Sequence, residues 1–346
     1  MNGSSWRRLF SLPLALVLSL GLQAAPAAAV ADKEYIVHPL VSSVAGPAHT
    51  DSNLINAWGL TAGPATPWWV ADNGTNLSTI YRADGTPSLL VVDVRGHPTG
   101  AVFWSFAARA VFVFDTETRQ LRGWHPSQGN LTVVLKDRSD VGAIYKGLAF
   151  ASTTGGDRFY ATDFHNARVD VFDSSFNLVT SAGAFVDADL PSGYAPFGIQ
   201  TIGSRIFVTY AKQDADAADE IHGQGRGFVD VFDTSGSLLA RVAQHGQLNA
   251  PWGLAMAPAN FGGFSGDLLV GNFGDGQINA YAETANGSFE HRGELRGTDG
   301  RSLSIDGLWA LQFGHGAPAN GPANVLFFTA GPNDESEGLF GSITTP

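Results

Sequence analysis

The chain has no cysteine and few charged residues, and bases are scarcer than acids. Its 346 residues include 20 Lys and Arg against 32 Asp and Glu, which gives a formal net charge of −12. Without thiols there is no disulfide, no thiolate nucleophile and no Cys-ligated zinc. A chain of this length can instead be stabilised by its hydrophobic core. Because acids outnumber bases, we expect no nucleic-acid partner.

Several motifs of well-known enzyme classes are also missing. The chain contains no Gly-x-Ser-x-Gly, no His-Glu-x-x-His and no Gly-x-x-x-x-Gly-Lys segment. Serine hydrolase, zinc protease and P-loop chemistry therefore have no local support.

The N-terminus carries a pattern typical of a signal peptide. Arg7 and Arg8 precede an apolar run at residues 9–22, and small residues at 27–31 offer cleavage sites. We interpret residues 1–31 as a signal peptide of a secreted or periplasmic protein. The Sec route is favoured, although Arg7-Arg8-Leu9-Phe10 also fits the twin-arginine pattern. No other apolar segment is long enough to span a membrane, so we expect no membrane span.

The main feature of residues 32–346 is a segment that recurs six times. In each copy a small or apolar residue leads into Gly and an apolar strand, and further strands follow. The glycines stand at 59, 100, 147, 198, 253 and 307, with spacings of 41, 47, 51, 55 and 54 residues. Four strands recurring at about 40 to 50 residues are typical of β-propeller blades. We therefore predict a single all-β propeller domain over residues 32–346.

The two ends of the repeat region indicate how the ring closes. The fifth copy predicts strands at 252–257, 267–271, 277–282 and 289–295. The sixth copy starts at Ile305-Asp306-Gly307-Leu308 and predicts only three, at 308–313, 325–329 and 339–343. The unassigned β segment 35–41 would supply the outer strand of the last blade and remove an open edge. The prediction is a six-bladed β-propeller closed by its N-terminal strand.

Topology places any site on the face where the first strand of each blade begins and the second ends. Loops on such a rigid scaffold are the usual position of binding residues. Candidate ligand-binding residues on this face are His97, Lys146, Tyr210, Lys212, Asp306 and Asn333. Asp72, Asp115 and Asp275, in contrast, are interpreted as residues that bond their own turns. Trp58, Trp252 and Trp309 are interpreted as packing between blades.

Three acidic places are candidates for a divalent cation, calcium being favoured. The connection 210–227 is longer than in sister blades, and Asp214, Asp216 and Asp219 could ligate a cation or form a solvated acidic lid. Asp163 and His165 could form a metal or general-base site with His97 and Lys146. Asp334 and Glu335, with Asp306 nearby, suit calcium or a cationic ligand.

Several segments together resemble an uncharacterised family of bacterial secreted proteins, some of which end in a PEP-CTERM sorting tail. They include Leu-Asn-Ala-Pro-Trp-Gly-Leu at 248–254, Val-Gly-Asn-Phe-Gly-Asp-Gly at 270–276 and Tyr-Ala-Lys-Gln-Asp-Ala-Asp at 210–216. The resemblance covers about 35–343 and implies an NHL-like propeller. It implies no catalytic residues, and this chain lacks the Pro-Glu-Pro tail.

We rank a secreted binding module first, with a loop face that recognises an extracellular ligand or protein, and we expect a monomer. The alternative is an enzyme of the lactonase or NHL-lyase type with a metal at the channel mouth. That alternative rests on analogy of fold, which does not determine function. A purely structural role in the envelope or matrix is the third hypothesis.

Overall fold

The computed structural model of the protein describes residues 1–3, 34–105 and 109–346. The predicted signal peptide, apart from residues 1–3, lies outside these ranges and stays a prediction. Within the described ranges, no helix is long and apolar enough to cross a membrane.

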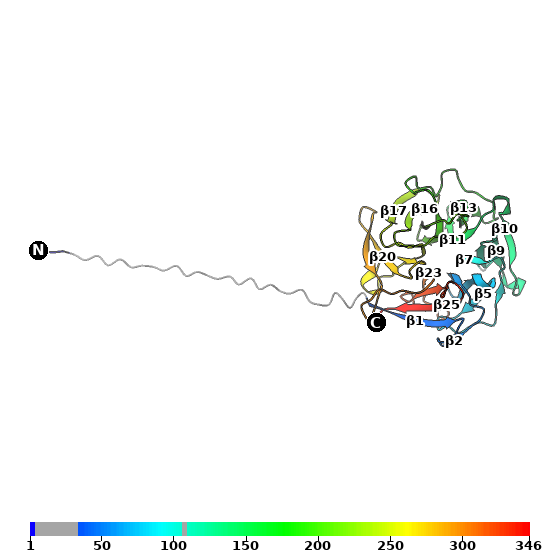
Figure 1. The fold of residues 1–346 in the computed structure, drawn as a ribbon, viewed down its shortest axis with the longest axis horizontal. Helices are drawn as coiled ribbons and strands as arrows, with labels where there is room; N and C mark the ends of the chain where they lie inside the picture. Colours follow the sequence, from blue (N-terminus) through cyan, green and yellow to red (C-terminus); the bar gives the residue numbers. More distant parts are fainter. Residues whose placement is uncertain (4–33, 106–108) are drawn as a thin grey trace.

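Six sheets surround a central axis, as predicted (Figure 1). Blade 1 contains β3 (Ala57–Thr61), β4 (Trp68–Asp72), β5 (Leu77–Tyr81) and β6 (Val92–Asp93); blade 2 contains β7 (Pro98–Phe103), β8 (Phe112–Thr116), β9 (Gln120–Trp124) and β10 (Val133–Asp137). Blade 3 contains β11 (Tyr145–Thr153), β12 (Gly156–Asp163) and β13 (Arg168–Asp173); blade 4 contains β14 (Tyr194–Ile202), β15 (Arg205–Lys212), β16 (Phe228–Asp233) and β17 (Leu238–Gln244). Blade 5 contains β18 (Pro251–Met256), β19 (Leu268–Asn272), β20 (Ile278–Glu283) and β21 (Phe289–Glu294).

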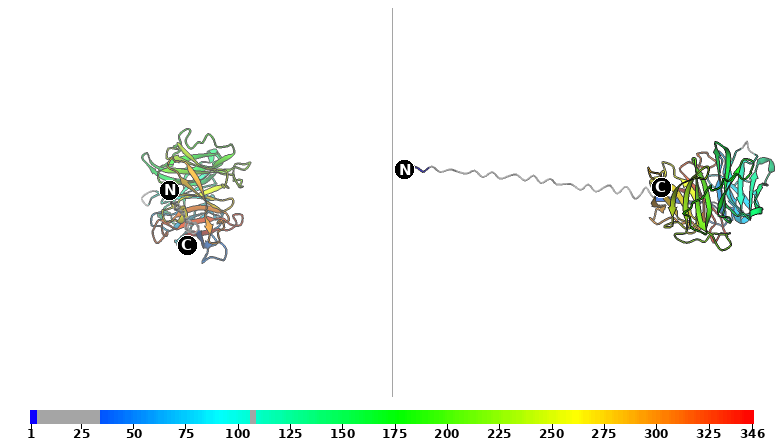
Figure 2. Two further views of the ribbon diagram at one scale, coloured as in Figure 1. Left: turned by 90° about the vertical axis from the view of Figure 1, so that its left-hand side faces the viewer. Right: turned by 90° about the horizontal axis from the view of Figure 1, so that it is seen from above.

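Blade 6 is built from both ends of the domain. Its strands are β23 (Leu308–Phe313), β24 (Leu326–Ala330), β25 (Leu339–Thr344) and β1 (Glu34–Ser42), with β2 (His49–Thr50) and β22 (Arg296–Gly297) paired to β1. β1 runs antiparallel to β25, with Val37 opposite Ile343. Figure 2 shows the C-terminus at the edge of the ring, and in Figure 1 it lies beside β1. The predicted closure by the N-terminal strand is confirmed.

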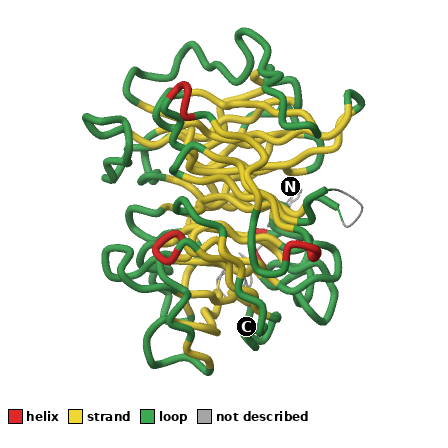
Figure 3. Tube along the Cα trace, turned by 90° about the vertical axis from the view of Figure 1, so that its right-hand side faces the viewer, coloured by secondary structure: helices red, strands yellow, loops and turns green. Residues whose placement is uncertain are grey.

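Helical structure is confined to single turns in the described residues: η3 (Asn73–Thr75), η4 (Pro126–Gln128), η5 (Ser139–Val141) and η6 (Gly262–Phe264). Figure 3 shows these turns among strands and long loops. The hydrophobic core lies between neighbouring sheets and around the axis, with Trp68, Phe112, Phe159 and Phe207 at most 1% exposed.

Blade 3 differs from the predicted four-stranded pattern, because its described part forms only three strands. The segment after β13 makes one isolated bridge, Phe172 with Leu178. The backbone N–H of Val171 donates to the Thr180 hydroxyl (2.7 Å) instead of to a strand carbonyl. The edge of β13 is therefore satisfied partly by this side chain and partly by backbone hydrogen bonds such as Val179 N–H to the carbonyl of Val171 (2.7 Å), where a fourth strand was expected.

The repeat glycines lie where the inner strands of adjacent blades come closest. A Cβ on Gly198 would lie 2.1 Å from the carbonyl oxygen of Trp252, and one on Gly253 would lie 2.5 Å from that of Trp309. No Cβ fits at such distances, so the close approach of the blades requires glycine.

In the sixth copy of the repeat, the glycine that the sequence pattern predicts lies three residues before the position that the structure shows. Each inner strand contains a register shift, between Ala57 and Leu60 in blade 1 and between Leu308 and Leu311 in blade 6. The structural equivalent of the repeat glycine is thus Ala310, not Gly307. Gly307 has a φ of +64°, so its glycine serves a turn. Glycine is required at the other repeat positions by the neighbouring blade and at Gly307 by a turn, yet both give a similar spacing in the sequence.

Candidate ligand-binding site at the channel mouth

Large aromatic side chains close the central channel near the face on which the inner strands begin. Trp58 and Trp309 pack edge to face with ring centroids 4.1 Å apart, and Trp252 and Phe197 pack on Trp309 at 5.9 and 5.8 Å. These residues immediately precede the repeat position on their strands. The interpretation of the tryptophans as packing residues is confirmed, and Trp58 also lines a pocket at this face.

The pocket at this face, which we call the acidic mouth, has a volume of about 490 Å³. It combines five carboxylic acids with one lysine, one histidine, two amides and aromatic rings. Its lining residues are Asn56, Trp58, Asn73, Glu117, Lys146, Asp219, Glu220, His222, Phe273, Asp334 and Glu335. They come from all six blades, so the site exists only in the closed ring.

Lys146 is the buried cation of the acidic mouth, and its side chain is 1% exposed. Its Nζ atom lies 2.5 Å from Oε1 of Glu117 and 2.9 Å from Oδ1 of Asp219, and 5.1 Å from the centre of the Trp58 ring. Burial by itself would lower the pKa of Lys146, but the carboxylates of Glu117, Glu220 and Asp219 outweigh it and raise that pKa. Lys146 therefore stays charged and holds Glu117 and Asp219 in place.

A chain of amides fixes the position of Glu117. The indole N–H of Trp309 donates to Oδ1 of Asn56 (3.0 Å), and Nδ2 of Asn56 donates to Oδ1 of Asn73 (3.3 Å). Nδ2 of Asn73 donates to Oε2 of Glu117 (3.0 Å). Both oxygens of Glu117 are thus engaged, which gives one wall of the pocket a rigid polar surface.

Two further carboxyl groups of the pocket, those of Glu220 and Glu335, are buried, and Lys146 offsets the effect of burial on their pKa only in part. Burial raises the pKa of Glu220 to about 8, against the opposing effect of Lys146. Burial likewise raises the pKa of Glu335, again opposed by Lys146. One lysine therefore serves more acids than it can neutralise, and at neutral pH Glu220 is largely protonated.

The long connection of blade 4 forms one side of the acidic mouth. An antiparallel β-bridge between Gln213 and Glu220 closes the acidic part of this connection. Nε2 of Gln213 also donates to the carbonyl of Phe164 (2.6 Å). Asp214 accepts from the backbone N–H of Ala218 (2.9 Å), which holds the tip of the loop in a turn. The loop lies at the channel mouth, and Asp219 and Glu220 are its acids that line the pocket.

The structure does not gather the predicted metal ligands. Among the described residues, no group of three or more His, Asp or Glu side chains is arranged to hold a metal ion. Asp163 is buried and accepts from Asn166, and Arg168 lies 3.3 Å away. His165 is exposed against the carbonyl of Ala217, and Asp216 is exposed at the loop tip. Asp214 is occupied by its turn, as above. Only Asp219, Asp334 and Glu335 of this set line the acidic mouth.

Of the predicted ligand-binding residues, only Lys146 lines the pocket. Tyr210 is buried beside Asp230, and the Lys212 ammonium lies over the ring of Tyr194 on the far side of the loop. The remaining three lie outside the pocket: His97 reaches the carbonyl of Asn73, and Asp306 accepts from the backbone of Asn333.

The sequence places Glu220 and His222 only within the connection 210–227, and it singles out neither Glu117 nor Phe273 as a site residue. Glu117 follows the second strand of blade 2 by one residue, in the set of positions that topology places on this face. Glu117 pairs with Lys146, 29 residues later in the chain, and this contact can be recognised only when the two adjacent blades are packed side by side. The usable signal was a single Lys at a position where sister blades carry Trp, Thr or Phe.

No family model matches the chain. Two proteins of Acanthamoeba polyphaga mimivirus are similar to it over most of its length. Uncharacterized protein R648 is 32% identical over 86% of this chain and 76% of its own, and uncharacterized protein L690 is 30% identical over 86% and 82%. They confirm the expected kind of family, one without an assigned activity, but they are viral rather than bacterial.

A solved structure of streptogramin B lyase resembles the fold, with a TM-score of 0.54 and 11% identity over 91% of this chain and 99% of that one. A protein of unknown function from Bacteroides thetaiotaomicron gives a TM-score of 0.58 with 9% identity, over 89% and 76%. At these identities the likeness concerns the propeller fold alone.

Proposed function

The chain belongs to the family of uncharacterized proteins that includes mimivirus R648 and L690, and we propose that it is a secreted binding module that holds a small organic cation in the acidic mouth. The observation that carries the proposal is the excess of carboxyl groups around one buried lysine in a pocket of about 490 Å³.

The charge balance of the pocket favours a positively charged ligand. Lys146 is already paired with Glu117 and Asp219. Glu220, Asp334 and Glu335 line the same pocket, and no other lysine or arginine does. A bound amine or guanidinium would supply the missing positive charge and pair with Glu220, whose carboxyl group burial otherwise keeps largely protonated.

The aromatic rings of the pocket favour an organic cation over a bare metal ion. Phe273 stacks on Trp309 with centroids 4.1 Å apart, and Phe273 and Trp58 both line the pocket. Aromatic faces attract ammonium and guanidinium groups and cover their apolar carbons. The metal-dependent enzyme that the sequence left as an alternative would need three or more His, Asp or Glu side chains grouped around a metal ion, and the described residues form no such group. Metal analysis of the purified protein tests that alternative directly.

The raised pKa of Glu220, about 8, gives the binding reaction a definite pH dependence. A cation bound beside Glu220 lowers this pKa, so binding below pH 8 releases a proton. The affinity should therefore rise with pH up to about 8 and then level off. Measured heats in buffers of different ionisation enthalpy should report the released proton.

The test is isothermal titration with agmatine, putrescine and choline, followed by the variants Glu220→Gln and Glu335→Gln. Each variant removes a carboxylate from the pocket, and we expect about a tenfold or larger loss of affinity, since a charge-assisted hydrogen bond contributes about 1.5–3 kcal/mol. Asp306→Asn is the matched control, because it removes the same charge from the same face outside the pocket and should change the affinity less than about twofold. Absence of binding by all three cations, or equal losses in the control, would contradict the proposal.

Secretion is tested separately. The mature N-terminus of the exported protein should begin near residue 30 or 32, after the small residues of the predicted cleavage site. N-terminal sequencing of protein from the medium or periplasm measures this, and a full-length chain retained in the cytoplasm would contradict it.

A further inference from the structure

The opposite end of the channel carries a second pocket of about 280 Å³, which we call the amide mouth. It lies where the inner strands of five blades end, and its polar side chains are Gln200, Gln312, Thr61, Thr201 and His315. None of its lining residues is Asp, Glu, Lys or Arg. This neutral lining contrasts with the acidic mouth at the other end.

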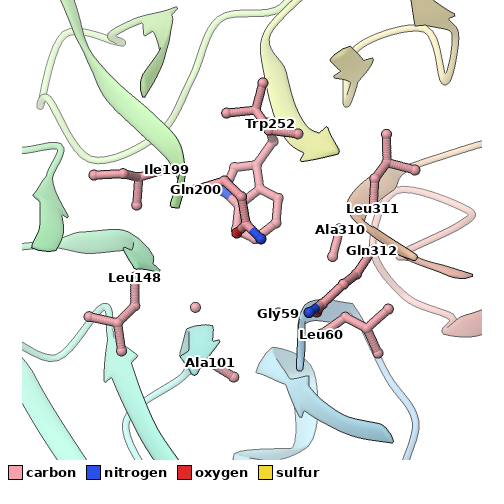
Figure 4. A pocket seen from close by; sticks show the side chains of 12 residues that line it. Gly59, Leu60, Ala101, Leu148, Ile199, Gln200, Trp252, Ala310, Leu311 and Gln312 are labelled. Atoms are coloured by element: carbon pink, nitrogen blue, oxygen red, sulfur yellow. The ribbon is translucent and has the colours of Figure 1, made fainter. Parts of the chain in front are cut away.

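The two mouths are separated by the aromatic side chains that close the channel, Trp58, Phe197, Trp252 and Trp309. Between these side chains and the amide mouth lies a cavity of only about 20 Å³, room for about one water molecule. Figure 4 shows the side chain of Gln200 against the ring of Trp252 and that of Gln312 pointing toward Gly59, so the two amides enter this space from two different strands. The amide mouth is thus a closed cup, with two primary amides at its base.

Polar atoms of the cup are left without protein partners in the described part of the chain. The Thr201 hydroxyl is buried and has no hydrogen-bond partner there. The Gln200 amide makes no side-chain hydrogen bond to a described residue, and Gln312 contacts only His315, at 3.3 Å between their Nε2 atoms. The Thr201 hydroxyl is the buried atom of this set, and the side chains of Gln200 and Gln312 are half-buried. The amides are therefore open to a partner that both donates and accepts hydrogen bonds.

We propose that the amide mouth binds a neutral, hydroxyl-rich molecule the size of one sugar ring. The two amides offer donors and acceptors to adjacent hydroxyl groups, and the absence of charged lining residues disfavours ions. Leu60 and the half-buried Phe150 provide an apolar surface for the C–H face of such a ring. The volume is at the lower end of small-molecule pockets, which excludes large ligands. This site is independent of the cation site proposed above.

The test is saturation-transfer NMR of the full-length protein with glucose, galactose and N-acetylglucosamine at tens of millimolar. The double variant Gln200→Leu/Gln312→Leu should weaken binding about tenfold, since two neutral hydrogen bonds together contribute about 1–3 kcal/mol. Gln247→Leu is the matched control, an exposed glutamine on another surface, and should stay within about twofold. Glu220→Gln should also leave sugar binding unchanged.

If the leucine variant does not fold, Gln200→Asn/Gln312→Asn keeps both amides but shortens their reach, and it should weaken binding by a similar factor. Thermal melting by circular dichroism establishes that each variant is folded. No saturation transfer to any of the three sugars, or equal affinity in the folded wild type and double variants, overturns the proposal.

Discussion

At the scale of single residues, acidic side chains that look alike in the sequence have different surroundings. Asp275 bonds its own turn, accepting from the backbone of Gln277 (3.1 Å), as predicted. Asp72 and Asp115 are structural too, but they join strands: Asp115 accepts from the Thr99 hydroxyl (2.9 Å) and the backbone of Gly100 (2.5 Å). A local pattern therefore predicted the role of these acids but not their contacts.

Asp115 is fully buried, and we predict that it makes the protein less stable as pH rises. Burial raises its pKa from 3.8 to about 7, so the folded state favours the neutral acid. The folding advantage of this protonated group is complete below pH 3.8, and it is lost as pH rises to about 7. The shift of about 3 pH units corresponds to about 4 kcal/mol.

Asp115→Asn replaces the acid by a neutral amide of the same shape. The variant should match the wild type at pH 4 and exceed it in unfolding free energy above pH 7, by up to about 4 kcal/mol. Urea unfolding from pH 4 to 9 measures the difference curve. A difference that does not change with pH would show that Asp115 is charged in the folded protein.

At the scale of elements, the inner strands account for both the success and the error of the repeat pattern. Five copies were placed correctly because the same glycine is required by the same close contact between blades. In the sixth copy Ala310 occupies this position, and Gly307 three residues earlier imitated it. A spacing rule cannot distinguish a glycine required by a neighbouring blade from one required by a turn, because the sequence does not show what lies opposite.

Exchanging the two residue types tests this assignment. Gly198→Ala places a Cβ 2.1 Å from the carbonyl oxygen of Trp252, and the inner strands must separate. We expect a loss of about 1–3 kcal/mol, typical of overpacking. The reverse change, Ala310→Gly, removes only a buried methyl group and should cost about 1 kcal/mol. Thermal melts compare the two, and a Gly198→Ala variant as stable as the wild type would show that the blades can move apart freely.

At the scale of the whole molecule, the ring was predictable and the site largely was not. Counting strands was sufficient for six blades and for closure by residues 35–41, because alternating apolar strands are a local signal. The acidic mouth combines residues as distant as Asn56 and Glu335, which meet only because the ring closes. The missing fourth strand of blade 3 was also unpredictable, since one Thr180 hydroxyl replaces a strand contact.

Closure by β1 should therefore control the stability of the entire ring. Tyr35 and Val41 of β1 are buried, and the Tyr35 hydroxyl donates to the carbonyl of Phe261 (3.0 Å) in blade 5. Without β1, β25 keeps its antiparallel partner β24 but loses the outer one and becomes an open edge. Burial of two large side chains contributes about 3–6 kcal/mol, which is comparable to the total stability of a typical domain.

A chain that starts at residue 43 should consequently fail to unfold cooperatively or should aggregate, whereas a chain that starts at residue 32 should melt in one sharp transition. Calorimetry and size-exclusion chromatography measure both. A synthetic peptide of residues 32–46, added in excess, should restore the sharp transition, because it can pair with β25 in trans and bury the same side chains. If the shorter chain instead melted within a few degrees of the longer one, the ring would be held by its inner strands, and β1 would only cover an edge.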